Sequence, residues 1–296
     1  MYLRARKQRG IALIQVIITT SIIMLLMIFF LGAAKDQVMR AQALQNKTMA
    51  YLSHYSAKNQ VLYQLLTSDH SELRQQRWNF YGTPIQLNEH TTVAIQDLNG
   101  LFSLPSMARP SILQRILEPT LGASQASVVA DSMMDWIDLD NISLGSGAEQ
   151  SSYDRYGIVV RNGPIQTYTE FPYINGMSVE AELILLENTT IHPTPFYNPM
   201  TSPQTLFGAY FEDEAMAQSA MSLRGGSSYN KKDVQALTQV WPEDGLDYFT
   251  GPGFRLTINS KVADSFYGKV LEYEIYPYQD RPIHVLSRLP RQQLSR

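Results

Sequence analysis

The residues best suited to chemistry lie in one acidic, glycine-containing loop. Its candidate ligands are the carboxylates of Asp138, Asp140, Glu149 and Asp154. Carboxylates and loop carbonyls are the hard oxygen donors that Ca²⁺ prefers, and the ion takes about six to eight of them. The spacing differs from that of an EF-hand, so the ligand set stays open. We expect a calcium site, and a solvated turn after a helix is the alternative.

Catalytic signatures are absent from the sequence. It contains no G-x-S-x-G elbow, no H-E-x-x-H pair and no P-loop. Cysteine does not occur, and the five histidines never stand at metal-ligand spacing. The formal net charge of −3 argues against a nucleic-acid binder that relies on a basic face. We therefore expect neither an enzyme nor a disulfide scaffold.

The N-terminal segment predicts a membrane anchor. Residues 11–34 carry no charge, and at ~1.5 Å per residue they reach ~36 Å, enough to cross a hydrocarbon core of ~30 Å. Four bases and no acid precede them within residues 1–10. By the positive-inside rule the N-terminus stays in the cytoplasm and the following chain is exported.

The junction between the basic leader and the apolar run is specific, because the leader ends in Gly10 and Ile11 follows at once. This junction resembles the prepilin signal of type IV pilins and type II secretion pseudopilins. The resemblance implies that prepilin peptidase cuts between Gly10 and Ile11 and that Ile11 is then N-methylated. The cut chain would hold 20 bases against 27 acids, a net charge of −7. An uncleaved signal anchor is the alternative.

Beyond the apolar run the sequence predicts a long helix, then strands. No Gly or Pro occurs from residue 33 to residue 81, which favours a helix continuing to about Leu66. The face expected to pack on a sheet comprises Val38, Ala41, Met49, Leu52, Tyr55, Leu62 and Leu66. Strands are expected at 78–81, 91–96 and 101–104, with a hairpin signal at Asn99-Gly100.

A helical block and a second set of strands complete the predicted order. Helical spacing of apolar residues predicts helices near 112–117, 126–136, 178–187, 202–207, 212–223 and 231–240. Strands are expected again at 254–258, 269–276 and 283–286.

Three motifs in this region carry a closer resemblance. Residues 97–104 read Asp-Leu-Asn-Gly-Leu-Phe-Ser-Leu, residues 135–140 read Asp-Trp-Ile-Asp-Leu-Asp before Gly147-Ala148-Glu149 and Tyr153, and Asn198 precedes a predicted helix. In this order they resemble the motifs of the minor pseudopilin K family of type II secretion systems. Gln150 and Ser103 depart from the Asp and Asn usual in that family. The resemblance also implies calcium in the helical domain.

Gln15 would be the fifth residue after cleavage. Most pilins and pseudopilins have Glu there, and its carboxylate is thought to neutralise the amino terminus of the next subunit. A buried ammonium without such a partner costs several kcal/mol. The K family lacks this Glu, and a tip subunit has no subunit ahead of it. Gln15 thus implies a tip position, and a merely tolerated polar residue is the alternative.

The expected fold is α+β and pilin-like. A long N-terminal helix, membrane-spanning in its first half, packs on an antiparallel sheet that carries a large inserted α-helical domain. The expected divisions are the leader 1–10, the transmembrane half 11–34, the rest of the first helix with the first strands 35–107, the inserted helical domain 108–250 and the C-terminal strands 251–296.

The resemblance implies a minor pseudopilin at the tip of the type II secretion pseudopilus, where it helps to start assembly and the export of folded proteins across the outer membrane. It implies as partners the I- and J-type minor pseudopilins, the major pseudopilin, prepilin peptidase, and the outer-membrane secretin or secreted cargo, with no nucleic acid. It implies a single-pass protein of the bacterial inner membrane with a periplasmic C-terminal domain. A membrane-anchored periplasmic enzyme or binding protein and a minor pilin of a related type IV system are the alternatives.

Overall fold

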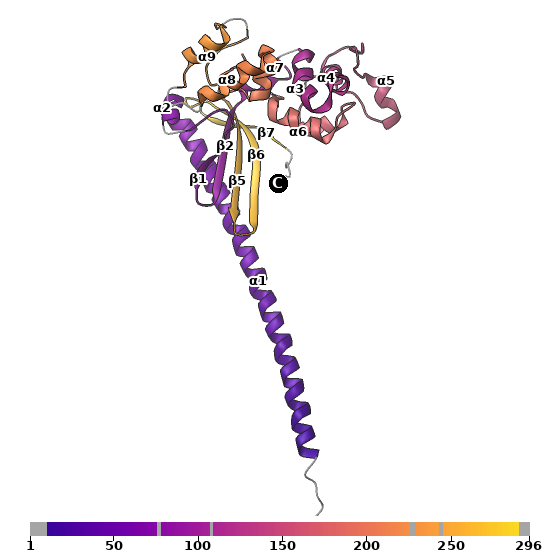
Figure 1. Cartoon of the computed structure of the whole chain (residues 1–296), viewed down its shortest axis with the longest axis vertical. Coiled ribbons are helices and arrows are strands. Elements are labelled where there is room, and N and C mark those ends of the chain that lie inside the picture. The colour runs from indigo at the N-terminus through magenta and orange to yellow at the C-terminus, as the bar shows by residue number, and fades with distance from the viewer. Residues whose placement is uncertain (1–10, 76–77, 107–108, 225–228, 243–244, 290–296) are drawn as a thin grey trace, which may run out of the picture.

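The computed structural model describes residues 11–75, 78–106, 109–224, 229–242 and 245–289. It begins with one long helix, α1 (Ile11–Thr67), whose first half projects far from the rest of the molecule (Figure 1). A short helix, α2 (His70–Gln75), follows. The predicted extension of the first helix to about Leu66 is confirmed, because nothing between residues 33 and 67 breaks a helix.

A five-stranded antiparallel sheet packs against the second half of α1 (Figure 1). In spatial order its strands are β1 (Ile85–Asn88), β2 (Thr91–Asp97), β5 (Gly253–Val262), β6 (Ser265–Ile275) and β7 (Ile283–Arg288). Along β5 the alternate residues Phe254, Leu256 and Ile258 are buried in the core that the sheet shares with α1. The last strands therefore complete a sheet that begins before the helical block.

The face of α1 that packs on the sheet differs from the predicted face. The buried residues of α1 are Ala50, His54, Ala57, Val61, Leu62 and Leu65. Of the predicted face, only Leu62 is buried and Leu66 is half-buried, whereas Val38, Met49 and Leu52 are exposed. The prediction followed the large apolar residues, but the small residues Ala50 and Ala57 allow the helix to approach the sheet closely.

The remaining helices lie between β3 and β5 in the sequence and cover the end of the sheet remote from the projecting part of α1 (Figure 1). They are α3 (Pro110–Leu121), α4 (Ala123–Ile137), α5 (Gln150–Tyr153), α6 (Val179–Asn188), α7 (Gln204–Phe211), α8 (Glu214–Arg224) and α9 (Lys231–Thr238), with 3-10 turns η2 (Asp154–Tyr156) and η3 (Tyr168–Tyr173). These elements share an apolar core separate from the one beneath the sheet. They fall within 108–250, and the division into domains stays a prediction.

Two local predictions near β2 were wrong. Residues 78–81 form no strand, and Tyr81 makes only an isolated bridge to Gln96. Asn99-Gly100 lies in the 3-10 turn η1 (Leu98–Gly100) instead of a hairpin. The carboxylate of Asp97 accepts the Asn99 N–H and closes this turn, so the chain leaves the sheet.

After that turn the chain forms a small second sheet. The short strand β3 (Phe102–Ser103) pairs in parallel with β4 (Thr189–Thr190), which directly follows α6. The α+β class is thus confirmed, with a long N-terminal helix, an antiparallel sheet and additional helices.

Candidate metal centre

Three carboxylates meet where α4 ends and the acidic loop begins. Asp135 lies in the last turn of α4, Asp138 is its C-cap residue, and Glu149 directly precedes α5. Each can offer one oxygen, and these oxygens lie within 4.8 Å of one another. Asp135 and Asp138 are one helical turn apart, so they project to the same side. The intervening loop returns Glu149 to that side.

Several of these oxygens lack a hydrogen-bond donor. Both carboxylate oxygens of Glu149 and Oδ1 of Asp138 are buried without a partner. In contrast, Asp135 accepts the Leu144 N–H at 2.9 Å and the Ser143 hydroxyl at 3.3 Å. Buried oxygens without donors are costly in free energy. Protons or a cation would remove this cost.

Burial raises the pKa of all three carboxyl groups, and the neighbouring charges add to this effect. For Asp138, desolvation is the main cause, followed by the charges of Asp140 and Asp135. For Glu149, desolvation comes first and the charges of Asp135, Asp138 and Asp140 follow. For Asp135, burial also dominates. A divalent cation would reverse this destabilisation of the ionised forms.

Gly147 allows the loop to approach α4 closely. A Cβ atom at this position would collide with the carboxylate of Asp135. The neighbouring Ser146 donates its N–H to Oδ2 of Asp131 at 2.8 Å. Backbone donors thus fasten the loop to α4 while leaving the oxygens of Glu149 unpaired. This set of hard oxygen donors fits Ca²⁺, which binds through carboxylate and carbonyl oxygens.

The structure brings together two of the four predicted ligands, Asp138 and Glu149. Asp140 is exposed beside them and its charge acts on both. Asp154 is exposed and lies outside the cluster. The sequence interpretation missed Asp135, although its spacing of one helical turn from Asp138 was a usable signal.

Asp140 and Asp154 have hydrogen-bond partners of their own. Oδ1 of Asp140 accepts the N–H of Ile142 at 2.8 Å. Oδ1 of Asp154 accepts from Nε2 of Gln150 at 2.7 Å. Asp154 therefore stabilises the short helix α5 locally.

A different buried carboxylate joins the sheet to the helical block. Asp97 accepts hydrogen bonds from the N–H groups of Asn99 and Gly251, from Nδ2 of Asn198 at 3.0 Å and from the Thr201 hydroxyl at 2.9 Å. Burial raises the pKa of Asp97 to about 6, although these bonds lower it in part. Because hydrogen-bond donors surround the carboxylate, the role of Asp97 is structural. Its bonds explain why the motif at residues 97–104 and the motif at Asn198 meet here.

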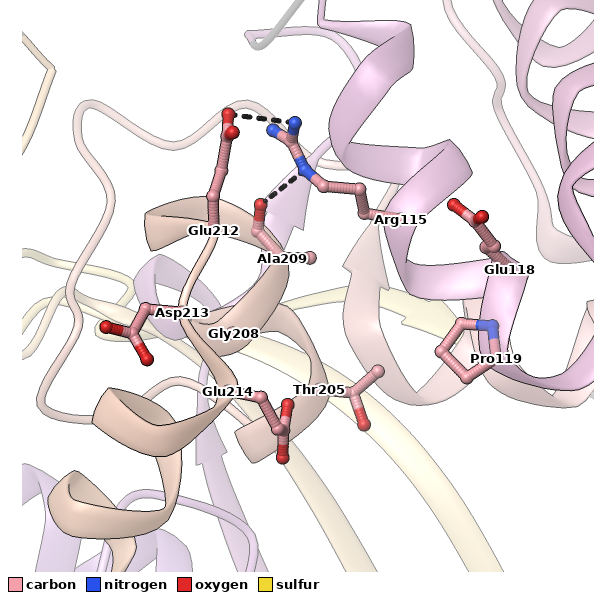
Figure 2. A pocket seen from close by; sticks show the side chains of 9 residues that line it. All are labelled: Arg115, Glu118, Pro119, Thr205, Gly208, Ala209, Glu212, Asp213 and Glu214. Carbon is pink, nitrogen blue, oxygen red and sulfur yellow. Dashed lines mark hydrogen bonds and ion pairs between the residues drawn. The ribbon is translucent and has the colours of Figure 1, made fainter.

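Figure 2 shows a hollow between α3 and the junction of α7 with α8. Its charged residues are Arg115, Glu118, Glu212, Asp213 and Glu214. Nη1 of Arg115 lies 2.8 Å from Oε1 of Glu212, and its Nε donates to the Ala209 carbonyl at 2.8 Å. Both contacts of Arg115 therefore hold α3 against the end of α7. We interpret the hollow as part of the packing between these helices.

The membrane-related predictions concern α1. Among the described residues, α1 is long and apolar enough to cross a membrane by length and composition. Gln15 is exposed within this apolar half. Gly10 lies outside the described residues and Ile11 begins the helix. Cleavage, methylation and the role of Gln15 stay predictions.

The long helix on an antiparallel sheet defines a pilin-like class of protein. Residues 96–194, a third of the chain, match the family model described as type II secretion system (T2SS), protein K. The matched segment runs from the end of β2 through α6 and includes the candidate metal centre. No curated protein matches the sequence.

A chain of the GspK-GspI-GspJ complex from the type 2 secretion system of enterotoxigenic Escherichia coli has the same fold. It is 16% identical, the match covers 86% of this chain and 100% of that chain, and the TM-score is 0.56. The resemblance to the minor pseudopilin K family is thus confirmed, in the family model over residues 96–194 and in the fold over most of the chain.

Proposed function

We propose that this chain is the minor pseudopilin at the tip of the type II secretion pseudopilus, where it helps to start assembly and the export of folded proteins across the outer membrane. The placement of the helical block carries this proposal. The block covers the end of the sheet remote from the membrane-spanning half of α1 and extends sideways beyond the sheet (Figure 1). In a filament wall it would collide with the subunit above, whereas at the tip no subunit lies above.

Gln15 supports the same position. The residue is uncharged and lies in the apolar half of α1, where a carboxylate would be needed to neutralise the amino terminus of a subunit ahead. A tip subunit has no such neighbour. The loss of a carboxylate there is therefore harmless at the tip and costly in the wall.

The protein would act by docking and carry no catalytic step. Its tip surface would meet the outer-membrane secretin or secreted cargo, and its stem would meet the I- and J-type minor pseudopilins and the major pseudopilin. Prepilin peptidase would cut it between Gly10 and Ile11. The anchor would lie in the inner membrane with the N-terminus in the cytoplasm, and the sheet and helices would lie in the periplasm.

Calcium would stabilise the helical block. Asp135, Asp138 and Glu149 would hold the ion, with Asp140 adjacent. Bound there, the ion would neutralise carboxylates that otherwise repel one another and would fix the acidic loop to α4.

Single-site labelling tests the tip position. The chain has no cysteine, so Lys232→Cys on the exposed part of α9 creates one site for maleimide-coupled gold. We expect gold at one end of pseudopili assembled with this variant, whereas a cysteine in the major pseudopilin should be labelled along the whole filament. Regular labelling of Lys232→Cys along the wall would contradict the tip position. Label on membranes but never on pseudopili would favour a membrane-anchored periplasmic protein.

A further inference from the structure

Large apolar side chains are exposed together at the sideways end of the helical block, where α4 and α5 lie (Figure 1). Leu139, Ile142, Val159 and Tyr173 are 84%, 75%, 81% and 57% exposed, and we call them the end surface. Apolar side chains that are exposed singly need no explanation, whereas a group of them marks an interaction site. The end surface therefore indicates a partner.

Hydrogen bonds hold the two main segments of the end surface side by side. Nδ2 of Asn162 donates to the carbonyl of Asp140 and to Oδ1 of Asn141, each at 3.1 Å. These bonds join the acidic loop, which carries two of the exposed apolar residues, to the segment 158–162, which carries the third. The end surface is thus built from chain segments that the fold brings together.

Val159 and Tyr173 also line a hollow of about 470 Å³, a volume within the range of ~300–1,000 Å³ that ligand pockets occupy. Trp136, Arg161 and Glu170 contribute to its lining. Nη2 of Arg161 donates to Oε1 of Glu170 at 2.9 Å, and Nε1 of Trp136 donates to Oε2 of Glu170 at 3.3 Å. The charges of Arg161 and Glu170 thus neutralise each other. The hollow therefore suits an apolar side chain.

The part of the block that carries the end surface is strongly acidic. Residues 131–187 contain ten acids and two bases, a net charge of −8, although the whole chain has a net charge of −3. The exposed Asp140 lies within the loop of the end surface. The exposed Asp154 accepts from Nε2 of Gln150, which also donates to the carbonyl of Ile158 in the lining of the hollow at 3.0 Å. A partner with complementary charge is basic.

We propose that the end surface docks a basic segment of the outer-membrane secretin, one apolar side chain of which fills the hollow while flanking Lys or Arg side chains meet Asp140 and Asp154. The inference rests on the proposed function and adds the surface and the chemistry of the partner. The apolar contact supplies most of the affinity, and the charges steer and select the partner.

The position and the shape of the end surface favour the secretin over exported cargo. The surface lies at the side of the helical block (Figure 1). The wall of a channel that receives the tip lies beside the tip, whereas cargo pushed ahead of the tip meets its top. A hollow of fixed shape also suits a partner that is the same in every cycle of export, whereas cargo proteins differ from one another.

Binding of the full chain in detergent to the purified periplasmic domains of the secretin of its own secretion system tests this proposal. Val159→Ser/Tyr173→Ser should weaken binding about tenfold in biolayer interferometry, because apolar area is lost from the contact. The melting temperature should not change, because both residues are exposed. The matched control Val285→Ser/Tyr278→Ser makes the same substitutions at exposed positions outside the end surface and should change binding less than twofold.

A second pair of variants tests the charge of the partner. Asp154→Lys should weaken binding about fivefold at low salt, because an attraction becomes a repulsion, and high salt should narrow the difference. Asp264→Lys makes the same change of charge at an exposed position between β5 and β6 and should change binding less than twofold. Asp154 lies outside the carboxylate cluster of the metal centre, so its effect is separate from that of calcium.

The outcomes separate this inference from the proposed function. Wild-type chain that does not bind the secretin domains would overturn the inference, while gold at one end of pseudopili would leave the tip position standing. Equal losses in a variant and its control, or no loss with Asp154→Lys, would also overturn it. Loss of the I- and J-type subunits with Val159→Ser/Tyr173→Ser, at unchanged secretin binding, would identify a contact within the filament. Binding of exported proteins but not of the secretin would identify cargo, and either result would overturn the inference.

Discussion

Arg255 and Glu272 are cross-strand partners on β5 and β6, and their side chains form a buried ion pair at 2.7 Å. Arg255 also donates to the carbonyls of Leu186 and Thr189 and to the hydroxyl of Tyr168. These three residues belong to the helical block. The ion pair therefore attaches the helical block to the sheet. It lies in a polar layer between the two apolar cores.

Removing one partner of this pair should be strongly destabilising. Arg255→Met leaves the carboxylate of Glu272 buried without its cation, which typically costs about 3–5 kcal/mol. The double variant Arg255→Met/Glu272→Leu should recover part of this loss, because no unpaired charge remains. Urea unfolding at pH 7 of a fragment from residue 35 onward measures both. A double variant no more stable than Arg255→Met would mean that the polar layer matters for more than its charge balance.

Calcium should raise the melting temperature of the same fragment. Binding to the folded state alone adds about 2.7 kcal/mol at a hundredfold excess over Kd, which is a shift of several degrees. Asp138→Asn and Glu149→Gln should each remove most of the shift. Asp154→Asn is the matched control and should retain it, since Asp154 lies outside the cluster. Equal melting curves in calcium and in chelator would leave the loop as a solvated turn.

Calcium should also reverse the pH dependence that the metal centre contributes to the stability of the fragment. Without metal, the raised pKa values of Asp138 and Glu149 mean that the folded state holds protons more tightly. Their contribution is present at low pH and is lost as the pH rises through the folded-state pKa values. With calcium, protons compete with the ion and stability rises with pH instead. Differential scanning calorimetry from pH 4.5 to 7.5 measures this contribution as the difference in stability between the unaltered fragment and the double variant Asp138→Asn/Glu149→Gln. If this contribution changed with pH in the same direction with and without calcium, the prediction would be contradicted.

His54 should make the fragment acid-sensitive. Burial between α1 and the sheet is the main reason that its pKa falls to about 4, and the charges of Lys269 and Lys58 add to it. The resulting stabilisation is present above the ordinary pKa of about 6.5 and is lost as the pH falls toward 4, by at most ~3 kcal/mol. His54→Leu should flatten this loss, at the cost of the hydrogen bond between Nδ1 and the Ile258 carbonyl. His284 is exposed, so the control variant His284→Gln should leave the loss of stability at low pH unchanged in the same titration.

Processing at the predicted junction can be read from the mass of the chain. If prepilin peptidase recognises it, the mature protein lacks residues 1–10 and carries a methyl group on Ile11. Gly10→Ala should be partly processed, because the added side chain is small, whereas Gly10→Glu should remain full-length. Intact-mass spectrometry of membrane extracts decides this. Full function of an unprocessed Gly10→Glu variant would favour a plain signal anchor.

Local chain properties could be predicted from the sequence. The run without Gly or Pro from residue 33 to residue 81 favours the long helix α1. Apolar spacing locates α3, α4, α6, α7, α8 and α9 to within a few residues, whereas the four-residue α5 was not predicted. The alternation along β5 and β6 likewise predicts strands. Each of these depends on residues a few positions apart, because helix and strand periods are set by the local backbone.

Only the tertiary structure decided which distant side chains meet. It brought Asp135 into the carboxylate cluster and left Asp154 outside, because the path of the loop sets the distances and composition does not. It placed Val38, Met49 and Leu52 of α1 outward and set Ala50 and Ala57 against the sheet beside Val61 and Leu65, because close approach favours small side chains there. It also gathered Asn198, Thr201 and Gly251 around Asp97. Such contacts arise when elements pack and their polar groups find partners, a global condition that a local pattern of residues does not specify.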